Sequence, residues 1–307
     1  MVDEFYLKRG TLISEEEWVQ RINKLELEVK NALVKNGFLS GEKAVDKVEG
    51  VLKNSILSRT TLRNGVLFSG GIDSTLIAFF LKKFRANLVC YTVGFEDSPD
   101  LNMALRVADE LGFRIKYRIV DDDTLLKTIT KVVNVLNSHD KMRVGVGSVL
   151  MLASELALKD NTVNLFSGLG SEEIFAGYQR HYNTFKASGD VNESCWNGLK
   201  TMYFRDLVRD YRISSQLRIK LRTPFLDEEL IRVAMRLSPY EKISHKHKKL
   251  ILRKIALKNN IRDYIALRPK KAAQYGTLFE KRMIRIAKSA GYKNVEDYLK
   301  NILVQNA

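Results

Sequence analysis

The feature that most constrains the fold is a short apolar run that ends in a Ser-Gly-Gly turn, at residues 66–74. The run itself, residues 66–68, is typical of a buried strand, and the apolar residues from 76 to 81 predict a helix directly after the turn. Glycine lets backbone N–H groups approach a ligand closely, and the helix points the positive end of its dipole at the same place. The sequence therefore predicts an anion site between a strand and a helix.

The residues around this turn favour a polyphosphate as the anion. The lysine of a Walker P-loop is missing, which argues against a kinase or a GTPase. Asp73 stands where a carboxylate could hold Mg²⁺ against phosphate oxygens, and Ser69 and Ser74 add hydroxyl groups. On spacing alone, a turn without a ligand remains the competing interpretation.

The composition is that of a globular protein. Of the 307 residues 45% are hydrophobic, which is enough for a core, and no apolar run approaches the roughly 20 residues of a membrane span. The first residues do not resemble a signal peptide, so we expect a cytoplasmic protein with no membrane partner. Cys90 and Cys195 lie far apart in a chain without C-x-x-C, which indicates neither a disulfide framework nor a zinc site.

The net charge of +15 is unevenly distributed. Residues 1–199 hold 25 basic and 26 acidic side chains, whereas residues 200–307 hold 26 basic and 10 acidic ones. A nucleic-acid or polyphosphate surface is one explanation of this excess. Lysine-rich amphipathic helices with a solvated face are the favoured one.

Hydrophobic periodicity predicts strands that alternate with helices. Four strands are expected, at 65–68, 87–93, 114–120 and 163–166. Helices are expected before and between them, at 14–37, 41–58, 98–111, 124–136 and 146–158. From residue 171 onward only helices and loops are expected.

This order predicts an α/β fold with a doubly wound parallel sheet and helical N- and C-terminal parts. We divide the chain into a helical segment, 1–60, and a domain, 61–307. Ligands of such sheets bind at the carboxyl ends of the strands. The loops 69–74, 94–100 and 167–173 would then lie along one edge.

The third of these loops repeats the pattern of the first, because Ser-Gly-Leu-Gly follows a predicted strand and Ser-Glu-Glu opens a helix. Glu172 and Glu173 would complement the helix dipole in any case. Two such loops at neighbouring strand ends could also hold a nucleotide and a metal ion from both sides.

Residues 69–74, Ser-Gly-Gly-Ile-Asp-Ser, resemble the PP-loop of the ATP pyrophosphatases. Later segments resemble the class B asparagine synthetase family, in the same order along the chain. Residues 167–178 are similar to its S-G-E-G-S/A-D-E-L/V-F-G-G-Y, and residues 222–227, R-T-P-F-L-D, to its R-V-P-F-L-D. Residues 249–253 and 268–271 are similar to its K-x-I/L-L-R and R-x-K segments. The resemblance covers roughly residues 45 to 285.

This resemblance implies the synthetase part of that family, a carbon–nitrogen ligase that uses ATP and Mg²⁺. The enzyme adenylates the side-chain carboxylate of aspartate, releases pyrophosphate, and lets ammonia displace AMP. The expected catalytic residues are Lys249, which stabilises the transferring phosphoryl group, and the metal-binding carboxylates Asp73 and Glu172. The expected nucleotide-binding residues are Leu67, Ser69, Gly70, Gly71, Asp73, Ser74, Val93, Gly94 and Gly168.

The chain departs from the family in three places. It starts Met1-Val2 about 60 residues before the PP-loop, so we expect no glutaminase domain and a nitrogen supply from free ammonia, a separate glutaminase subunit or another amine. Leu169 replaces a family glutamate that plausibly orients the amine. Arg218 and Lys220 replace a glycine and a glutamate in a region that helps to hold the amino acid, which changes the charges that the pocket accepts.

Two alternatives to aspartate amidation therefore stay open. The same adenylation chemistry could act on a different carboxylate or amine acceptor, or the chain could be an RNA-modifying or RNA-binding PP-loop protein. The expected partners are a small carboxylate, ammonia or an amine, the separate glutaminase and a second copy of the chain. Nucleic acid is a less favoured partner.

Overall fold

The structure is a computed structural model that describes residues 3–268 and 276–305. The chain forms two compact units, each made of three separate segments. Unit 1 comprises Met1–Thr60, Ser167–Leu207 and Arg222–Pro269. Unit 2 comprises Thr61–Phe166, Val208–Leu221 and Lys270–Ala307. The predicted boundary at residue 60 coincides with one boundary between the units, and the division into two domains there stays a prediction.

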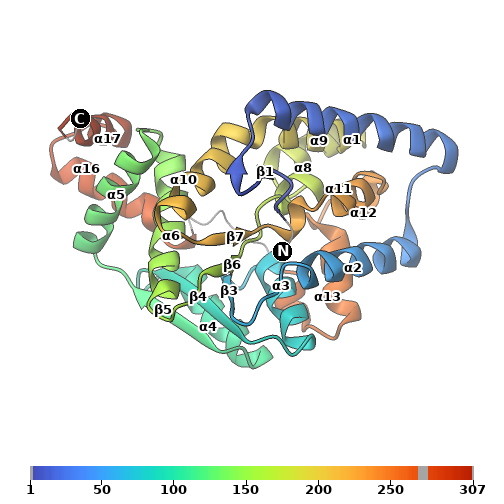
Figure 1. Cartoon of the computed structure of the whole chain (residues 1–307), viewed down its shortest axis with the longest axis horizontal. Coiled ribbons are helices and arrows are strands. Elements are labelled where there is room, and N and C mark those ends of the chain that lie inside the picture. Colours follow the sequence, from blue (N-terminus) through green and yellow to red (C-terminus); the bar gives the residue numbers. More distant parts are fainter. Residues whose placement is uncertain (1–2, 269–275, 306–307) are drawn as a thin grey trace. The chain divides into compact units, whose positions relative to one another are not determined.

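Unit 2 is organised around a five-stranded sheet (Figure 1). Its strands are β3 (Asn64–Leu67), β4 (Leu88–Gly94), β5 (Ile115–Ile119), β6 (Asn164–Phe166) and β7 (Lys220–Arg222). The spatial order is β5-β4-β3-β6-β7, and β3 pairs in parallel with both β4 and β6. The predicted doubly wound parallel sheet is confirmed.

Strand β7 corrects the expectation that no strand follows residue 171. The Lys220 N–H donates to the Val163 carbonyl oxygen over 2.8 Å, and the Ser167 N–H donates to the Arg222 carbonyl oxygen over 2.8 Å. Both pairs advance in the same chain direction, so β7 runs parallel to β6. A three-residue edge strand has too little periodicity to be recognised, because only its pairing with β6 defines it.

Helices cover both faces of the sheet in unit 2. They are α3 (Ile72–Lys83), α4 (Pro99–Leu111), α5 (Asp122–Leu136), α6 (Lys141–Leu158), α10 (Val208–Gln216), α16 (Phe279–Ser289) and α17 (Val295–Gln305). Val89, Tyr91 and Val93 of β4 point into a core shared with α5, α6, α16 and α17. Alternate strand residues face opposite ways, which leaves the other face to α3 and α4. The helices predicted in this unit are confirmed.

Unit 1 is mainly helical. Its helices are α1 (Glu15–Asn36), α2 (Gly41–Leu57), α7 (Ser171–Ile174), α8 (Gln179–Ser188), α9 (Asn192–Met202), α11 (Glu228–Met235), α12 (Pro239–Lys242), α13 (Leu250–Lys258) and α14 (Asp263–Ala266). As predicted, Ser14 caps α1, because its hydroxyl accepts a bond from the Glu17 N–H over 3.1 Å. A short hairpin, β1 (Leu7–Lys8) and β2 (Thr11–Leu12), precedes α1 and was not predicted. Its two turn residues have positive φ angles, as a two-residue hairpin turn requires.

A buried ionic network holds the segment of unit 1 that resembles R-V-P-F-L-D. Glu4, only 1% exposed, accepts bonds from the backbone N–H and the hydroxyl of Thr223 over 3.2 and 2.9 Å. Arg59 donates to Glu4 over 3.0 Å and also to Asp227 over 3.0 Å. Because buried charges are costly unless they are paired, this network fixes the segment after β7 to the start of the chain.

Within the described residues, no helix is both long enough and apolar enough to span a bilayer.

Candidate functional site

The first glycine-rich turn, in unit 2, has a backbone conformation and a close packing contact that favour glycine. Gly70 has a φ of 63°, in the left-handed region. A Cβ atom at this position would lie 3.0 Å from the Met103 carbonyl oxygen and 3.2 Å from the Ala104 Cα atom of α4. The close contact with the backbone of α4 leaves little room for a side chain, and the left-handed conformation adds to the preference for glycine.

Two serines hold the shape of this turn. The Ser74 hydroxyl donates to the Gly71 carbonyl oxygen over 3.2 Å, lies 3.4 Å from the Ser69 hydroxyl and accepts the Ser69 N–H over 3.4 Å. Gly71 is the N-cap of α3, and Asp73, 6% exposed, lies in its first turn. The predicted residues 69–74 thus lie together at the positive end of a 12-residue helix.

The predicted nucleotide contacts of unit 2 lie beside this turn. Leu67 ends β3, and Val93 and Gly94 end the neighbouring strand β4. A Cβ atom on Gly94 would overlap the Ser98 hydroxyl oxygen, so this position also requires glycine. The carboxyl ends of two adjacent parallel strands therefore meet the loop that is predicted to bind phosphate.

The second glycine-rich turn, in unit 1, directly follows β6. Gly170 has a φ of 95°, and a Cβ atom there would lie 2.5 Å from the Leu226 Cδ2 atom. Gly168 precedes it in the turn, and the Leu169 N–H donates to the Ser167 hydroxyl over 3.2 Å. The segment that resembles R-V-P-F-L-D thus packs against this turn, which explains why the two motifs occur together.

Unit 1 brings together two predicted catalytic residues that are 77 positions apart. The Lys249 ammonium donates to Glu172 Oε1 over 2.6 Å and to the Ser171 hydroxyl over 3.0 Å. Lys249 is 5% exposed, whereas the Glu172 side chain is 35% exposed. The result is a carboxylate that is open on one side and a lysine that is fixed beside it.

Gly177 makes room for this pair, and its importance was not predicted. A Cβ atom at Gly177 would overlap both Glu172 Oε2 and Lys249 Cε. Gly177 belongs to the second motif in the sequence. The reason for a glycine there becomes clear only from the position of Lys249, which a larger side chain would overlap.

A buried polar cluster beside this pair was also missed as a site feature. Glu173, 1% exposed, accepts a bond from the Tyr178 hydroxyl over 2.6 Å and from Arg205 over 2.7 Å. Burial, aided by the neighbouring Asp206 carboxylate, raises the pKa of Glu173 to about 7. Only Glu172 was predicted to act, and Glu173 instead turns inward, where it orders the segment that carries Glu172.

A cavity of about 610 Å³ opens in unit 2 at the carboxyl ends of β4 and β5. Arg282 stacks on the Phe95 ring with 4.6 Å to its centroid and lies 3.7 Å from Asp97 Oδ1 and 3.9 Å from Asp122 Oδ1. Asp122 also pairs with Arg285. The lining is mainly acidic, because four carboxylates stand against one guanidinium.

The donor set fits a magnesium ion that takes most of its ligands from phosphate and water. Among the described residues no group of three or more His, Cys, Asp or Glu side chains could hold a metal ion. Mg²⁺ bound to substrate phosphates commonly uses only one or two carboxylates. Asp73 in unit 2 and Glu172 in unit 1 are the carboxylates predicted for this role, and the binding of a metal by either stays a prediction.

The fold and the two turns define a class, the doubly wound α/β proteins with a PP-loop after the first strand of the sheet. Within that class, the family model of asparagine synthase matches residues 47–189 and 183–290. The chain belongs to the asparagine synthase family. The R-x-K segment at 268–271 lies outside the described residues from position 269 onward.

Individual relatives agree with this assignment. The chain is 32% identical over 298 residues to a provisionally assigned glutamine-hydrolysing asparagine synthetase of Methanocaldococcus jannaschii, covering 85% of this chain and 55% of the relative. It is 28% identical over 262 residues to the glutamine-hydrolysing asparagine synthetase of Homo sapiens, covering 82% and 45%. The chain thus spans about half the length of these relatives.

Among solved structures, the NMN synthetase of Francisella tularensis is similar with a TM-score of 0.41 and 13% identity, covering 86% of this chain and 87% of that one.

Proposed function

We propose that this chain catalyses the ATP-dependent, AMP-forming amidation of a carboxylate. The carboxylate would attack the α-phosphorus of ATP, pyrophosphate would leave, and an amine would then displace AMP from the mixed anhydride. The observation that carries the proposal is the contact between Lys249 and Glu172, because it joins two distant motifs of the asparagine synthase family at one point. The intact turn at residues 69–74 supports it further.

Each group has a role that its chemistry suits. In unit 2, the backbone N–H groups at the start of α3 would bind the pyrophosphate part of ATP, with Ser69 and Ser74 as hydroxyl donors. The strand ends at Leu67, Val93 and Gly94 would receive the adenosine, together with Gly168 of unit 1. Lys249 would neutralise charge that develops on the α-phosphoryl group.

Magnesium is the metal that we assign to Asp73 and Glu172. When bound, it would neutralise phosphate charge and so reduce repulsion between the two anions that must meet. Glu172 is paired with the Lys249 ammonium in the structure. To bind the metal, the Glu172 carboxylate would have to give up part of this ion pair.

The relatives' names give asparagine as the product and glutamine as the compound hydrolysed. For this chain we propose aspartate and ammonia as the first candidate substrates, and two residues support a second candidate. Leu169, half-buried, has no group that could orient an amine or take its proton. Lys220 is exposed and basic where the family has an acid. A different carboxylate or amine is therefore the second candidate, with the same adenylation step.

The test is to follow pyrophosphate and AMP together after adding Mg·ATP, aspartate and ammonium to the protein. We expect equal release of both, with asparagine as the product. Other carboxylates and amines are then supplied one at a time, and a dependence on one of these would identify the second candidate. The absence of release with every acceptor would contradict the proposal.

A matched pair of variants makes this test specific. Asp73→Asn removes one predicted metal carboxylate and should abolish pyrophosphate release. Asp109→Asn makes the same change at an exposed position of α4 and should leave it unchanged. Full activity of Asp73→Asn would remove Asp73 from the site.

A further inference from the structure

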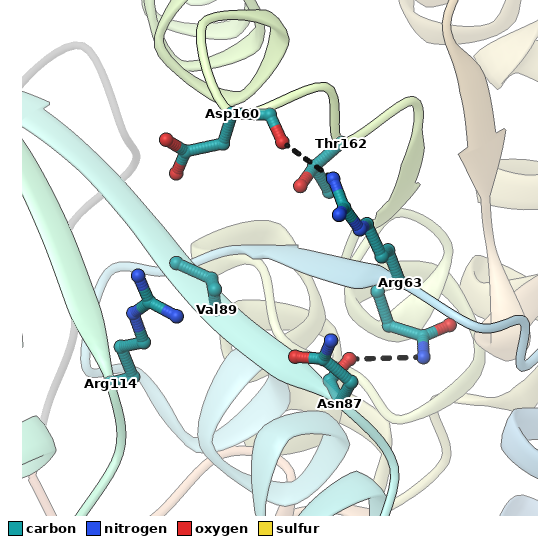
Figure 2. A pocket seen from close by; sticks show the side chains of 7 residues that line it. Arg63, Asn87, Val89, Arg114, Asp160 and Thr162 are labelled. Atoms are coloured by element: carbon teal, nitrogen blue, oxygen red, sulfur yellow. Dashed lines mark hydrogen bonds between the residues drawn. The ribbon is translucent and has the colours of Figure 1, made fainter.

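A second, smaller cavity lies at the opposite edge of the sheet, where its strands begin. It has a volume of about 220 Å³ and is formed within unit 2 (Figure 2). Arg63 immediately precedes β3, Asn87 precedes β4, Arg114 precedes β5, and Thr162 lies just before β6. Four neighbouring strands thus each contribute a polar residue to one cavity, away from the turn at residues 69–74.

Most hydrogen-bond donors of the two arginine side chains in this cavity have no protein partner among the described residues. Within the described residues, the Arg114 side chain makes no hydrogen bond or ion pair, while its carbonyl oxygen accepts the Cys90 N–H over 2.8 Å. The Arg63 side chain donates one weak hydrogen bond, to the Asp160 carbonyl oxygen over 3.5 Å. Figure 2 shows these two side chains flanking the cavity, with Asn87 near its floor. Since each guanidinium carries five N–H donors, most of them face water or a ligand.

The single acidic residue of the cavity is already engaged. Asp160 forms an ion pair with Lys116 and accepts a bond from the Tyr91 hydroxyl over 3.0 Å. The hydrogen bond from Lys116 holds the pKa of Asp160 below its usual value. The Asp160 carboxylate is thus neutralised from outside the cavity, and two guanidinium charges remain to attract an anion.

The floor of the cavity is rigid. Asn64, 1% exposed, accepts bonds from the Thr61 N–H over 2.8 Å and from Asn164 over 3.1 Å. Its amide also donates to the Asn87 carbonyl oxygen over 3.2 Å (Figure 2). Because the floor is tied to three strand starts, the donors around it need little reordering to bind a ligand.

We propose that this cavity binds a small inorganic phosphate ion, orthophosphate or pyrophosphate. Paired guanidiniums suit a tetrahedral oxyanion, because each can donate two parallel hydrogen bonds to it. The volume equals about seven water molecules, which admits either ion but is below the range of about 300 Å³ and more for larger ligands. The larger cavity of unit 2 differs, because four carboxylates and only one arginine line it. This inference does not depend on the proposed function.

The experiment is a titration of the full chain with orthophosphate and then pyrophosphate, at constant ionic strength, followed by backbone amide NMR shifts. We expect saturable shifts at residues 63–64, 87–89 and 114–116. Pyrophosphate is also expected to shift residues 69–75 if the proposed function holds, so the position of the shifts separates the two claims. Shifts that chloride reproduces equally would overturn the inference.

Variants at exposed positions complete the test. Arg63→Gln and Arg114→Gln should each weaken orthophosphate binding about tenfold or more, since each removes charge-assisted hydrogen bonds. Arg85→Gln, an exposed arginine of the same unit, should change nothing. Amide spectra verify that each variant is folded. Unchanged binding in both cavity variants, or AMP binding more tightly than orthophosphate, would overturn the assignment.

Discussion

In the first glycine-rich turn the hydrogen bonds of Ser69 and Ser74 join residues no more than five positions apart. In the second turn the partner of Glu172 is Lys249, 77 positions away, and the side chain that packs on Gly170 comes from Leu226. Both turns join a strand to a helix, yet α3 has 12 residues and α7 only four. The hydrogen bonds that shape the first turn are local, although Gly70 also packs against α4, whereas the contacts of the second turn come from distant segments of unit 1.

The two turns also differ in the chemistry that they suit. A local turn with a long helix offers a fixed set of N–H donors, which suits an anion that binds in the same way each time. A turn assembled from distant segments places a carboxylate next to an ammonium group, and such a pair can be rearranged when a metal or a phosphoryl group arrives. Variants that disturb one turn and not the other test this distinction.

The largest effect is expected from Lys249→Gln. This change removes the positive charge at the second turn and should lower pyrophosphate release by about 10²- to 10³-fold, the size seen when one preorganised charge-stabilising group is lost. The unfolding free energy should change little, because Glu172 is partly exposed and can be solvated. Lys246→Gln, a nearby exposed lysine, is the control. Equal activities in the two variants would exclude Lys249 from catalysis.

Gly177→Ala should have the next largest effect, on stability and activity together. Its methyl group would overlap the ends of two flexible side chains, those of Glu172 and Lys249, so we expect them to shift, with a loss of activity and a loss of about 1 kcal/mol in unfolding free energy. Chemical denaturation measures this. Gly50→Ala in α2 meets nothing within 4 Å and should instead stabilise by about 1 kcal/mol. A stable Gly177→Ala protein that keeps its activity would contradict the described geometry.

Gly70→Ala should affect activity less but should cost more stability, about 2 kcal/mol, since it combines a left-handed backbone with a 3.0 Å contact to the Met103 carbonyl oxygen. Because the first turn is local, its distortion should weaken nucleotide binding without disturbing the ion pair of Lys249. Isothermal titration with an ATP analogue, beside denaturation, separates these effects. Nucleotide affinity equal to that of the unchanged protein would show that this turn does not bind phosphate.

The smallest effect concerns pH. The pKa of Glu173 is about 7 in the folded protein, above its ordinary value of 4.5, so the folded state binds more protons than the unfolded state between these two values. The contribution of Glu173 to stability is therefore fully present below pH 4.5 and is lost as the pH rises from 4.5 through 7. Denaturation of the unchanged protein and of Glu173→Gln at several pH values isolates this contribution. If the unfolding free energies of the two proteins change with pH in the same way, the predicted contribution of Glu173 is wrong.

Much of the fold could be predicted because its signals are local. The cap of α1 at Ser14, the apolar run of β3 and the turn after it each lie within a few residues. Strand β7 and the hairpin β1–β2 could not be predicted. Strands of two or three residues are defined by the strands they pair with rather than by their own periodicity.

The candidate site divides in the same way. The residues of the first turn were identified from their types and spacing, and Glu172 and Lys249 only through motifs shared with a family. Gly177 and Glu173 were missed as site features, because their roles follow from which side chains they meet. The overlap of a Gly177 side chain with Lys249 and the hydrogen bond from Arg205 to Glu173 both involve residues far apart in the chain. Such contacts cannot be recognised from a short stretch of sequence.

The network around Glu4 also has a consequence for how this protein is made. Glu4 and Thr223 are 219 residues apart, and Ser55, which donates to the Pro224 carbonyl oxygen, is 169 residues from its partner. At a synthesis rate of about 5–20 residues per second, the first two helices of unit 1 wait roughly 10–40 s on the ribosome before those partners emerge. During that time their apolar faces have no final partner, so we expect the nascent chain to depend on chaperones until residue 230 or so has been made.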